Sequence, residues 1–443
     1  MNKRQFLLLS AGVVLTAFAL REWYVLASVL PNPTQGDVSS YLRYAQHMVL
    51  DGVFSQAENG AAVVPDAYRT PGYPLILAAI YRFTGMSGWF SAVYQVQVVI
   101  GALTVAGVIA LARQWLPCKW AVLAGALLAV WPHHIAATNA MLTEVVFAFA
   151  LIGSLLLASL ALSRRSLWLA VAAGAAFGVA YLVNPVIALF PAALLAVFWR
   201  ARAAKLGAVV LAVSLVAVVG WGVRNTLQDA HGDSRVWQNL VQGAWPGYHH
   251  AEKWWPWIAE DRAVRAGIAA EMEVTTTDHA AGLRMIGARM ASDPVRYARW
   301  YALEKPYLLW DWDVRMGQGG VYTLEVWNSP LDRGLMLAPT ILLWALNPAL
   351  FALAIGGVLL AFRGKPSEQM VALFFVYITA LHVVLQAEPR YAIAYRPIEI
   401  LMIAGAGLWI RERARGWRVA RSRVRRDAFA NPELIDVAPV PEG

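Results

Sequence analysis

The chain has 443 residues, of which 59% are hydrophobic and 15% are charged, and its formal net charge is +9. Soluble domains carry about 25% charged residues, so this composition excludes a soluble globular protein and indicates a polytopic membrane protein. Much of the positive charge lies after residue 410, which favours contact with anionic lipid over binding of nucleic acid. The single cysteine, Cys118, permits neither an intrachain disulfide nor a cysteine-based metal site.

Ten stretches of the chain are apolar and long enough to be predicted as helical membrane spans. They are residues 6–30, 89–113, 119–136, 141–163, 166–183, 186–200, 204–222, 335–361, 368–385 and 392–410. Trp131-Pro132 and Asn184-Pro185 mark breaks, because proline disfavours a continuous helix. We therefore predict an all-α integral membrane protein with about ten transmembrane helices and two long extracytoplasmic loops that carry juxtamembrane helices.

Basic residues set the orientation of these spans. They precede the first span and recur in every second connection, as at Arg164-Arg165, whereas residues 131–140 contain none. The positive-inside rule then places both termini in the cytoplasm. The predicted organisation is a transmembrane domain over 1–410, with extracytoplasmic loops at 31–88 and 223–334, and a cytoplasmic tail over 411–443 that is basic and then disordered.

The first loop contains a carboxylate followed by an amphipathic segment. Asp37 precedes residues 38–50, in which Tyr41, Tyr44 and Met48 recur at helical spacing. We expect this helix to lie on the membrane surface. The apolar run at 75–83 is too short to span, so we expect a juxtamembrane or re-entrant helix there.

The second loop is rich in aromatic residues and has a helical pattern. A helix pair is predicted at 259–271 and 278–291, and Asp293-Pro294 is predicted to begin another helix toward Trp310. Tryptophan favours the membrane interface, so we expect the loop to cap a cavity at the membrane surface. Its aromatic cluster consists of Trp245, Tyr248, Trp254, Trp255 and Trp257.

Two acids are candidates for chemistry on the extracytoplasmic side. Asp37 lies a few residues beyond a span, where a carboxylate suits the removal or orientation of a hydroxyl proton. Its alternative role is to cap the helix at 38–50. Glu144 lies near the start of the span at 141–163, where it either shapes a pocket or simply benefits from the helix dipole.

Four arginines on the same side are candidates for binding a phosphate, since guanidinium groups bind phosphate oxygens in pairs and stay charged. The alternative is that each extends to the lipid headgroups. A charge near the end of an apolar span is costly and is usually paired or functional. The four are Arg69, Arg224, Arg390 and Arg396.

Cofactor signals are weak. His133 and His134 suit a metal site with Asp37, but packing at the interface is the favoured reading, and no metal ligand is assigned. No cofactor is predicted with certainty, and a divalent cation remains open. The sequence has neither a Walker A loop nor a dinucleotide fingerprint, which argues against a nucleotide-linked donor.

Several short motifs together resemble the C-type superfamily of membrane glycosyltransferases. Within it, the chain is most similar to the polyprenyl- or dolichyl-phosphate-sugar-dependent mannosyltransferase and aminoarabinose transferase branch. The resemblance covers about residues 1–410. The motifs are Gly36-Asp37-x₃-Tyr41, Arg69-x-Pro71-Gly72-Tyr73-Pro74, Leu142-Thr143-Glu144 and Glu388-Pro389-Arg390-Tyr391, followed by Arg396-Pro397.

The resemblance implies particular roles for these residues. Asp37 matches the family's catalytic or acceptor-orienting carboxylate, Arg69 with Tyr73 matches the element that contacts the lipid phosphate, and Glu144 matches an acid that helps to form the pocket. The chain departs from many relatives in having one acid rather than two in the first loop. It also has Tyr68 where some relatives have an acid, so the metal requirement and the acceptor stay open.

We therefore expect an inverting glycosyltransferase that takes a hexosyl or pentosyl group from a polyprenyl-phosphate carrier at the extracytoplasmic face of a bacterial inner membrane. Asp37 is the expected base, and the expected partners are the lipid-linked donor, membrane lipids and a glycan, lipid or protein acceptor. The alternatives are a transporter or flippase for lipid-linked glycans and a polymerase or ligase that uses a lipid diphosphate. A transporter would be expected to place charges at mid-membrane and to show paired halves.

Overall fold

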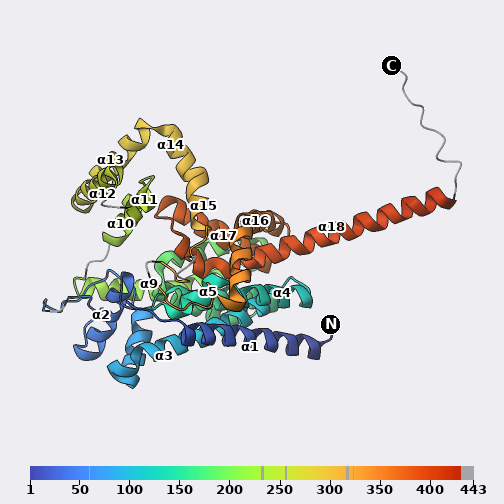
Figure 1. Cartoon of the computed structure of the whole chain (residues 1–443), viewed down its shortest axis with the longest axis horizontal. Helices are drawn as coiled ribbons and strands as arrows, with labels where there is room; N and C mark the ends of the chain where they lie inside the picture. The colour runs from blue at the N-terminus through green and yellow to red at the C-terminus, as the bar shows by residue number, and fades with distance from the viewer. Residues whose placement is uncertain (59, 231–233, 255–256, 316–318, 323, 431–443) are drawn as a thin grey trace, which may run out of the picture.

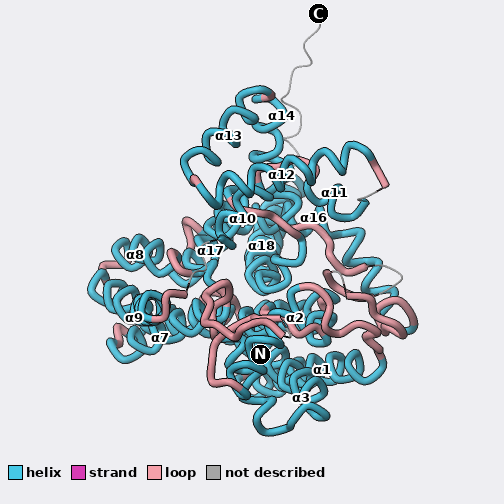
Figure 2. Tube along the Cα trace, turned by 90° about the vertical axis from the view of Figure 1, so that its left-hand side faces the viewer, coloured by secondary structure: helices cyan, strands magenta, loops and turns pink. Residues whose placement is uncertain are grey.

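The computed structural model describes every residue except 59, 231–233, 255–256, 316–318, 323 and 431–443. The described residues form helices and connecting loops, with one antiparallel bridge between Val29 and Trp327 (Figures 1 and 2). The predicted all-α fold class is therefore confirmed. Because a helix satisfies its own backbone hydrogen bonds, it suits a chain that is apolar over most of its length.

The first half of the chain supplies most of the membrane bundle. Its elements are α1 (Lys3–Ala27), α2 (Asp37–Leu50), α3 (Gly72–Ala112), α4 (Cys118–Ala129), α5 (Pro132–Ala136), η1 (Ala137–Asn139), α6 (Glu144–Arg164), α7 (Leu167–Val183), η2 (Pro185–Ile187), α8 (Phe190–Arg200) and α9 (Ala204–Leu227). Helix α2 lies where the amphipathic helix was predicted. The predicted juxtamembrane run forms the first part of α3, which is interrupted at Gly85, a residue with φ of 66°.

The second half begins with a group of helices outside the bundle and then returns to it. Its elements are α10 (Ser234–Gly243), α11 (Tyr248–Trp254), α12 (Ala259–Thr277), α13 (His279–Ser292), α14 (Pro294–Arg299), the π-helix η3 (Trp300–Glu304), α15 (Lys305–Leu309), η4 (Gly334–Met336), α16 (Leu337–Ala361), α17 (Pro366–Val384), η5 (Pro389–Tyr395) and α18 (Arg396–Ala430). The helix pair predicted in the second loop corresponds to α12 and α13.

Among the described residues, seven helices are long and apolar enough to cross a membrane, or eight if the bent pair Cys118–Ala129 and Pro132–Asn139 forms one span. The bend of 57° falls at the predicted Trp131-Pro132 break. The shorter apolar helices α7 and α8 occupy two further predicted positions. A multi-span membrane protein is thus confirmed, and the count of ten stays a prediction.

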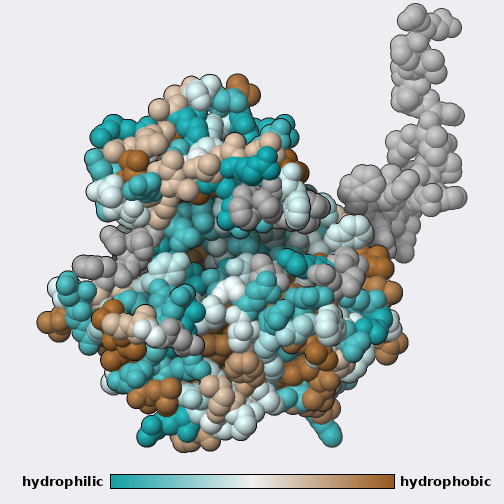
Figure 3. Space-filling view, turned by 60° about the vertical axis from the view of Figure 1, so that its left-hand side comes forward, coloured by the Kyte–Doolittle hydropathy of each residue, from teal (hydrophilic) through white to brown (hydrophobic). Residues whose placement is uncertain are grey.

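The two ends of the bundle differ. Figure 1 shows α2 and the group α10–α14 at one end, and the N-terminus with the projecting part of α18 toward the other. The α10–α14 group has a small apolar core of its own around Val241, Ala244 and Ile286. In Figure 3 hydrophilic residues predominate on this group, while hydrophobic patches gather on the bundle below it.

The tail does not begin at a break in structure. Helix α18 crosses the predicted boundary at residue 410 and ends at Ala430. The rest of the tail, where disorder was predicted, lies outside the described residues. The predicted division into 1–410 and 411–443 therefore remains a proposal.

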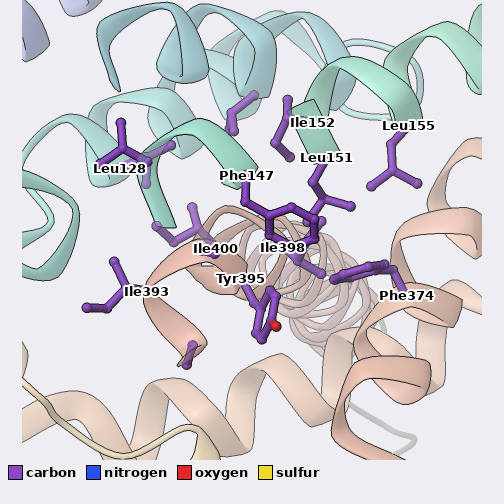
Figure 4. Close-up of a cluster of buried hydrophobic side chains, with 14 of the residues drawn as sticks. Leu128, Phe147, Leu151, Ile152, Leu155, Phe374, Ile393, Tyr395, Ile398 and Ile400 are labelled. Carbon is purple, nitrogen blue, oxygen red and sulfur yellow. The ribbon is translucent and has the colours of Figure 1, made fainter. Parts of the chain in front are cut away.

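The centre of the bundle fixes the elements that carry the site. Phe147 and Leu151 of α6 face Tyr395 and Ile398, where η5 passes into α18 (Figure 4). The rings of Phe147 and Tyr395 lie 6.2 Å apart, with planes at 81°. Such edge-to-face packing within a close-packed core holds the start of α6 beside η5. Glu144, the first residue of α6, and Arg390, the second residue of η5, are brought together as a result.

Candidate functional site

A cavity of about 480 Å³ lies where the first loop, α10 and the ends of α6, α7 and α17 meet. It collects four of the predicted site residues, which come from three distant parts of the sequence. These four are Asp37, Arg69, Glu144 and Arg390.

Asp37 is the first residue of α2, and Gly36, not Asp37, is the N-cap. The alternative of a capping carboxylate is therefore wrong. Asp37 Oδ1 instead accepts a hydrogen bond from Arg69 Nη2 at 2.6 Å, and Oδ2 accepts one from Arg390 Nη1 at 2.9 Å. Burial raises the pKa of Asp37, but the charges of Arg390 and Arg69 together hold that pKa well below its usual range. The carboxylate is ionised at neutral pH.

Arg69 is only 4% exposed and is held on every side. Its Nε donates to Ser40 Oγ at 3.1 Å and its Nη1 donates to Tyr41 Oη at 3.0 Å. The Tyr41 ring lies 4.4 Å below the guanidinium carbon. Because α2 supplies both partners one residue apart, the folding of this helix fixes Arg69 against Asp37. The predicted amphipathic helix thus forms one wall of the site.

Arg390 lies in η5 and is shared among carboxylates. Besides Asp37, its Nε lies 3.6 Å from Glu144 Oε1 and its Nη2 lies 3.9 Å from Glu388 Oε2. The Tyr322 ring covers the guanidinium at 3.9 Å. An aromatic ring over the flat face leaves the N–H edge free for oxygen atoms. An anion entering the cavity therefore meets two arginines whose edges point at the same carboxylate.

Three predicted residues are not brought into the cavity. Tyr73 is buried and donates from its hydroxyl to Gln97 Oε1 at 3.1 Å. Arg224 donates to the carbonyl of Asp66 at 2.8 Å and supports the first loop from outside. Arg396 is fully buried and pairs with Glu399 at 2.6 Å. Direct contact of these three residues with a substrate remains a prediction that the geometry does not support.

The two histidines of the suggested metal site have other partners. His133 Nε2 accepts from the backbone N–H of Asp313 at 3.0 Å, and His134 Nδ1 lies 3.0 Å from Arg21 Nη2. In the part of the chain that the structure describes, no group of three or more His, Cys, Asp or Glu residues is placed to hold a metal ion. A divalent cation remains an untested prediction.

Sequence reasoning missed Arg235, which lines the cavity from α10. Its guanidinium carbon lies 5.4 Å from the Tyr68 ring, and its charge contributes to the low pKa of Asp37. Arg235 is one of many basic residues in the second loop, and no local motif marks it. Only the placement of α10 over the cavity distinguishes it from the others.

Part of the cavity wall is apolar. It is formed by Val186 and Leu189, which follow α7, and by Tyr377, Leu381 and Leu385, which belong to or follow α17. The Tyr377 hydroxyl donates to the Val186 carbonyl at 2.6 Å and closes the wall. Leu189 is 68% exposed, so the wall reaches the outer surface of the bundle. The cavity thus joins a buried charge cluster to an apolar wall that is exposed at the surface of the bundle.

One family model matches part of the chain. Residues 68–221 match the family model described as dolichyl-phosphate-mannose-protein mannosyltransferase. No curated protein sequence matches the chain.

Three solved structures with a similar fold can be compared with the chain. One is the archaeal oligosaccharyltransferase AglB from Archaeoglobus fulgidus in complex with an inhibitory peptide and a dolichol-phosphate (TM-score 0.53, 16% identity, 95% of this chain and 52% of that chain). Another is the Archaeoglobus fulgidus oligosaccharyltransferase in its apo form (TM-score 0.51, 13% identity, 94% and 52%). A weaker likeness is to ArnT from Cupriavidus metallidurans in the apo state (TM-score 0.47, 15% identity, 98% and 65%).

The family-model match covers residues 68–221, and the solved structures show that the chain has a similar fold. The chain spans about half the length of the oligosaccharyltransferase, at 52% of that chain. At such identities the likeness establishes the fold, and the activity has to be argued from the site.

Proposed function

We propose that this protein is a membrane glycosyltransferase that moves a sugar from a polyprenyl-phosphate carrier to an acceptor hydroxyl at the extracytoplasmic face. One observation carries the proposal. Asp37 is held between Arg69 and Arg390 in a cavity that also has an apolar wall, and Leu189 of that wall is exposed at the surface of the bundle.

The cavity suits both halves of such a donor. An isoprenoid chain is apolar and gains free energy along the wall formed by Leu189, Leu381 and Leu385. A phosphate is anionic and gains charge-assisted hydrogen bonds from Arg69 and Arg390. The dolichol-phosphate bound to the archaeal oligosaccharyltransferase has the same two parts and supports this choice.

In the proposed transfer, each bond that forms is matched by one that breaks. The acceptor oxygen attacks the anomeric carbon, the bond from that carbon to the phosphate oxygen breaks, and polyprenyl phosphate leaves with the bonding electrons. The arginines neutralise the charge that develops on the phosphate. The acceptor proton passes to Asp37, and attack from the side opposite the phosphate inverts the anomeric centre.

The resting ion pairs of Asp37 fit this role because the donor alters them. In the free site the two arginines make the carboxylate a weak base. A phosphate that binds Arg69 and Arg390 competes for their N–H groups and brings its own negative charge close to Asp37. Both effects raise the pKa of Asp37. The base is thus activated only when a donor is bound.

Glu144 has a supporting role in this proposal. It begins α6 at the cavity edge, and its Oε1 lies 3.6 Å from Arg390 Nε. When Arg390 turns to the phosphate, Glu144 keeps one side of the guanidinium oriented. The proposed roles of Asp37 and Glu144 are thus linked, because both carboxylates contact Arg390.

The proposed location rests on where the site lies in the bundle. The site lies at the end of the bundle that carries α2 and α10–α14, away from the N-terminus (Figure 1). We assign this end to the extracytoplasmic side of a bacterial inner membrane, since the short basic connections belong to the other side. A glycan, lipid or protein hydroxyl reaches the site beneath the α10–α14 group.

The test is sugar transfer by purified protein in lipid vesicles. Wild type and Asp37→Ala are offered a panel of polyprenyl-phosphate-linked hexoses and pentoses, and release of polyprenyl phosphate is measured. Asp51→Ala is the matched control, because Asp51 lies at the other end of α2 with a side chain that is 43% exposed.

We expect release by wild type and by Asp51→Ala, and none by Asp37→Ala. Full activity of Asp37→Ala would refute the role of the carboxylate. Release by wild type from lipid diphosphates alone would favour a polymerase or ligase, and movement of intact glycolipid across the vesicle without release would favour a flippase.

A further inference from the structure

A buried amine lies at the junction between the α10–α14 group and the membrane bundle. Lys305, the first residue of α15, has no exposed surface. Its Nζ donates to the carbonyl of Gly243 at 2.9 Å and to the carbonyl of Leu385 at 2.5 Å. Gly243 ends α10 and Leu385 is the C-cap of α17, so one side chain joins the last carbonyls of two helices.

These carbonyls need such a partner. The last carbonyls of a helix have no donor within it, and the helix dipole makes this end negative. Trp300 adds a second donor to the Gly243 carbonyl, from Nε1 at 3.0 Å. Burial lowers the pKa of Lys305 to about 7, and an amine with two hydrogens still supplies both bonds. The junction therefore keeps its hydrogen bonds on either side of neutrality.

The two helix ends also touch through their backbones. A Cβ atom placed on Gly243 would lie 2.5 Å from the carbonyl carbon of Leu385 and 2.6 Å from the nitrogen of Gln386. Only glycine permits this approach. The contact is next to the site, because Leu385 and Gln386 line the cavity. The preceding π-helix, Trp300–Glu304, delivers Lys305 to this point.

The junction determines where α10 lies. Arg235, Val236 and Asn239 of α10 line the cavity, and the charge of Arg235 acts on Asp37. A second tie, from the Tyr68 hydroxyl to Gln238 Oε1 at 3.0 Å, fixes the middle of α10 to the first loop. If Lys305 no longer holds the Gly243 end, α10 keeps this tie, the Trp300 bond to Gly243, the stacking of Trp237 on His279 and its packing on α12, but its end is no longer joined by a side chain to the end of α17. Arg235 then loses its fixed position.

We propose that Lys305 is a positioning residue for glycosyl transfer, which holds α10 against the end of α17 and so fixes Arg235 in the donor cavity. This role rests on the proposed function. Lys305 touches neither the cavity nor a reacting atom. It acts by setting the distance between the α10–α14 group and the bundle.

The first measurement reports this distance without any need for activity. Spin labels are placed at Val376 of α17 and Arg284 of α13, both exposed, after Cys118→Ala. The distance distribution is then recorded in lipid by double electron–electron resonance. We expect one narrow distribution for the parent and a broad one for Lys305→Met, which keeps the side-chain volume but removes the donors.

Two further variants separate the role of Lys305 from a general loss of folding. Gly243→Ala keeps the lysine but pushes the helix ends apart, and we expect the same broadening. Lys365→Met is the control, since Lys365 is an exposed lysine at the other end of α17. We expect it to match the parent.

The second measurement is donor kinetics of the same variants. For Lys305→Met we expect the donor KM to rise about 10- to 100-fold with a smaller change in kcat, because misplaced binding groups weaken orientation. Lys305→Arg, which keeps donors, restores part of the loss. Narrow distances with parental KM in Lys305→Met would overturn the proposal. If Lys305→Met gives broad distances but the wild-type protein transfers no sugar, the proposed function is refuted, whereas the role of Lys305 in holding the junction is not.

Discussion

Replacing Arg390 with glutamine tests the phosphate site most directly. The side chain is 5% exposed, and its guanidinium lies 2.9 Å from Asp37 Oδ2 and 3.6 Å from Glu144 Oε1. Removing one partner of a buried ion pair costs about 3–5 kcal/mol, because the remaining charge stays buried without compensation. Asp37 keeps Arg69, so we expect the lower limit, about 3 kcal/mol of unfolding free energy.

The effect on transfer is expected to be larger than the effect on folding. Loss of one preorganised donor to a developing oxyanion lowers rates by about 10²–10³. We therefore expect Arg390→Gln to lower kcat/KM by that factor and to raise the donor KM. Arg390→Lys is expected to recover the charge but little activity, since an ammonium does not bridge Asp37 and a phosphate in one plane.

Arg396→Gln is the matched control. Both arginines are buried and ion-paired, but Arg396 pairs with Glu399 and donates to the carbonyl of Trp310 at 3.2 Å, away from the cavity. We expect a comparable loss of stability with an unchanged donor KM. The assays are thermal unfolding in lipid micelles and transfer kinetics well below both melting temperatures. Equal effects of the two variants on KM would refute the assignment of Arg390 to the phosphate.

Two further predictions concern pH. Because the pKa of Asp37 is lowered in the folded protein, its ion pairs stabilise the fold above about pH 4, and this stabilisation is lost as the pH falls further. The melting temperature of Asp37→Asn is therefore expected to depend less on pH below about 4 than that of wild type. A wild-type-like acid dependence in that variant would contradict this. Asp313 behaves in the opposite way: burial and then the charge of Glu388 raise its pKa to about 7, so wild type is expected to lose stability as the pH rises from about 4 to 7. Asp313→Asn should flatten the melting temperature over that range, and an unchanged slope would show that another group is responsible.

The sequence by itself determined the all-α membrane fold, and it predicts the side of the bundle on which the chemistry lies. Hydropathy locates spans because every segment inside the bilayer must be apolar and must satisfy its backbone hydrogen bonds, which a helix does within itself. The amphipathic helix after Asp37 and the helix pair in the second loop were predictable for a similar reason, since 3.6-residue periodicity is local. The break at Trp131-Pro132 follows from proline alone.

The sequence did not determine which basic residues share the cavity. Arg390 and Arg396 lie six positions apart with similar surroundings in the sequence, yet Arg390 faces Asp37 and Arg396 faces Glu399. The choice depends on the short helix η5, whose Tyr395 is packed against Phe147. The direction of a side chain at a helix end depends on how distant helices pack around it, and that packing cannot be read from the local sequence.

The positions of Arg235 and Lys305 likewise could not be predicted from the local sequence. Neither belongs to a motif, and each acquires its place because the end of α10 meets the end of α17. Local sequence sets the helices and their charges. Only tertiary contact decides which carbonyls and carboxylates those charges meet, because the contacts join segments that are distant in the sequence. Lys305 lies 62 and 80 residues from its two carbonyl partners, and Arg390 lies 353 residues from Asp37.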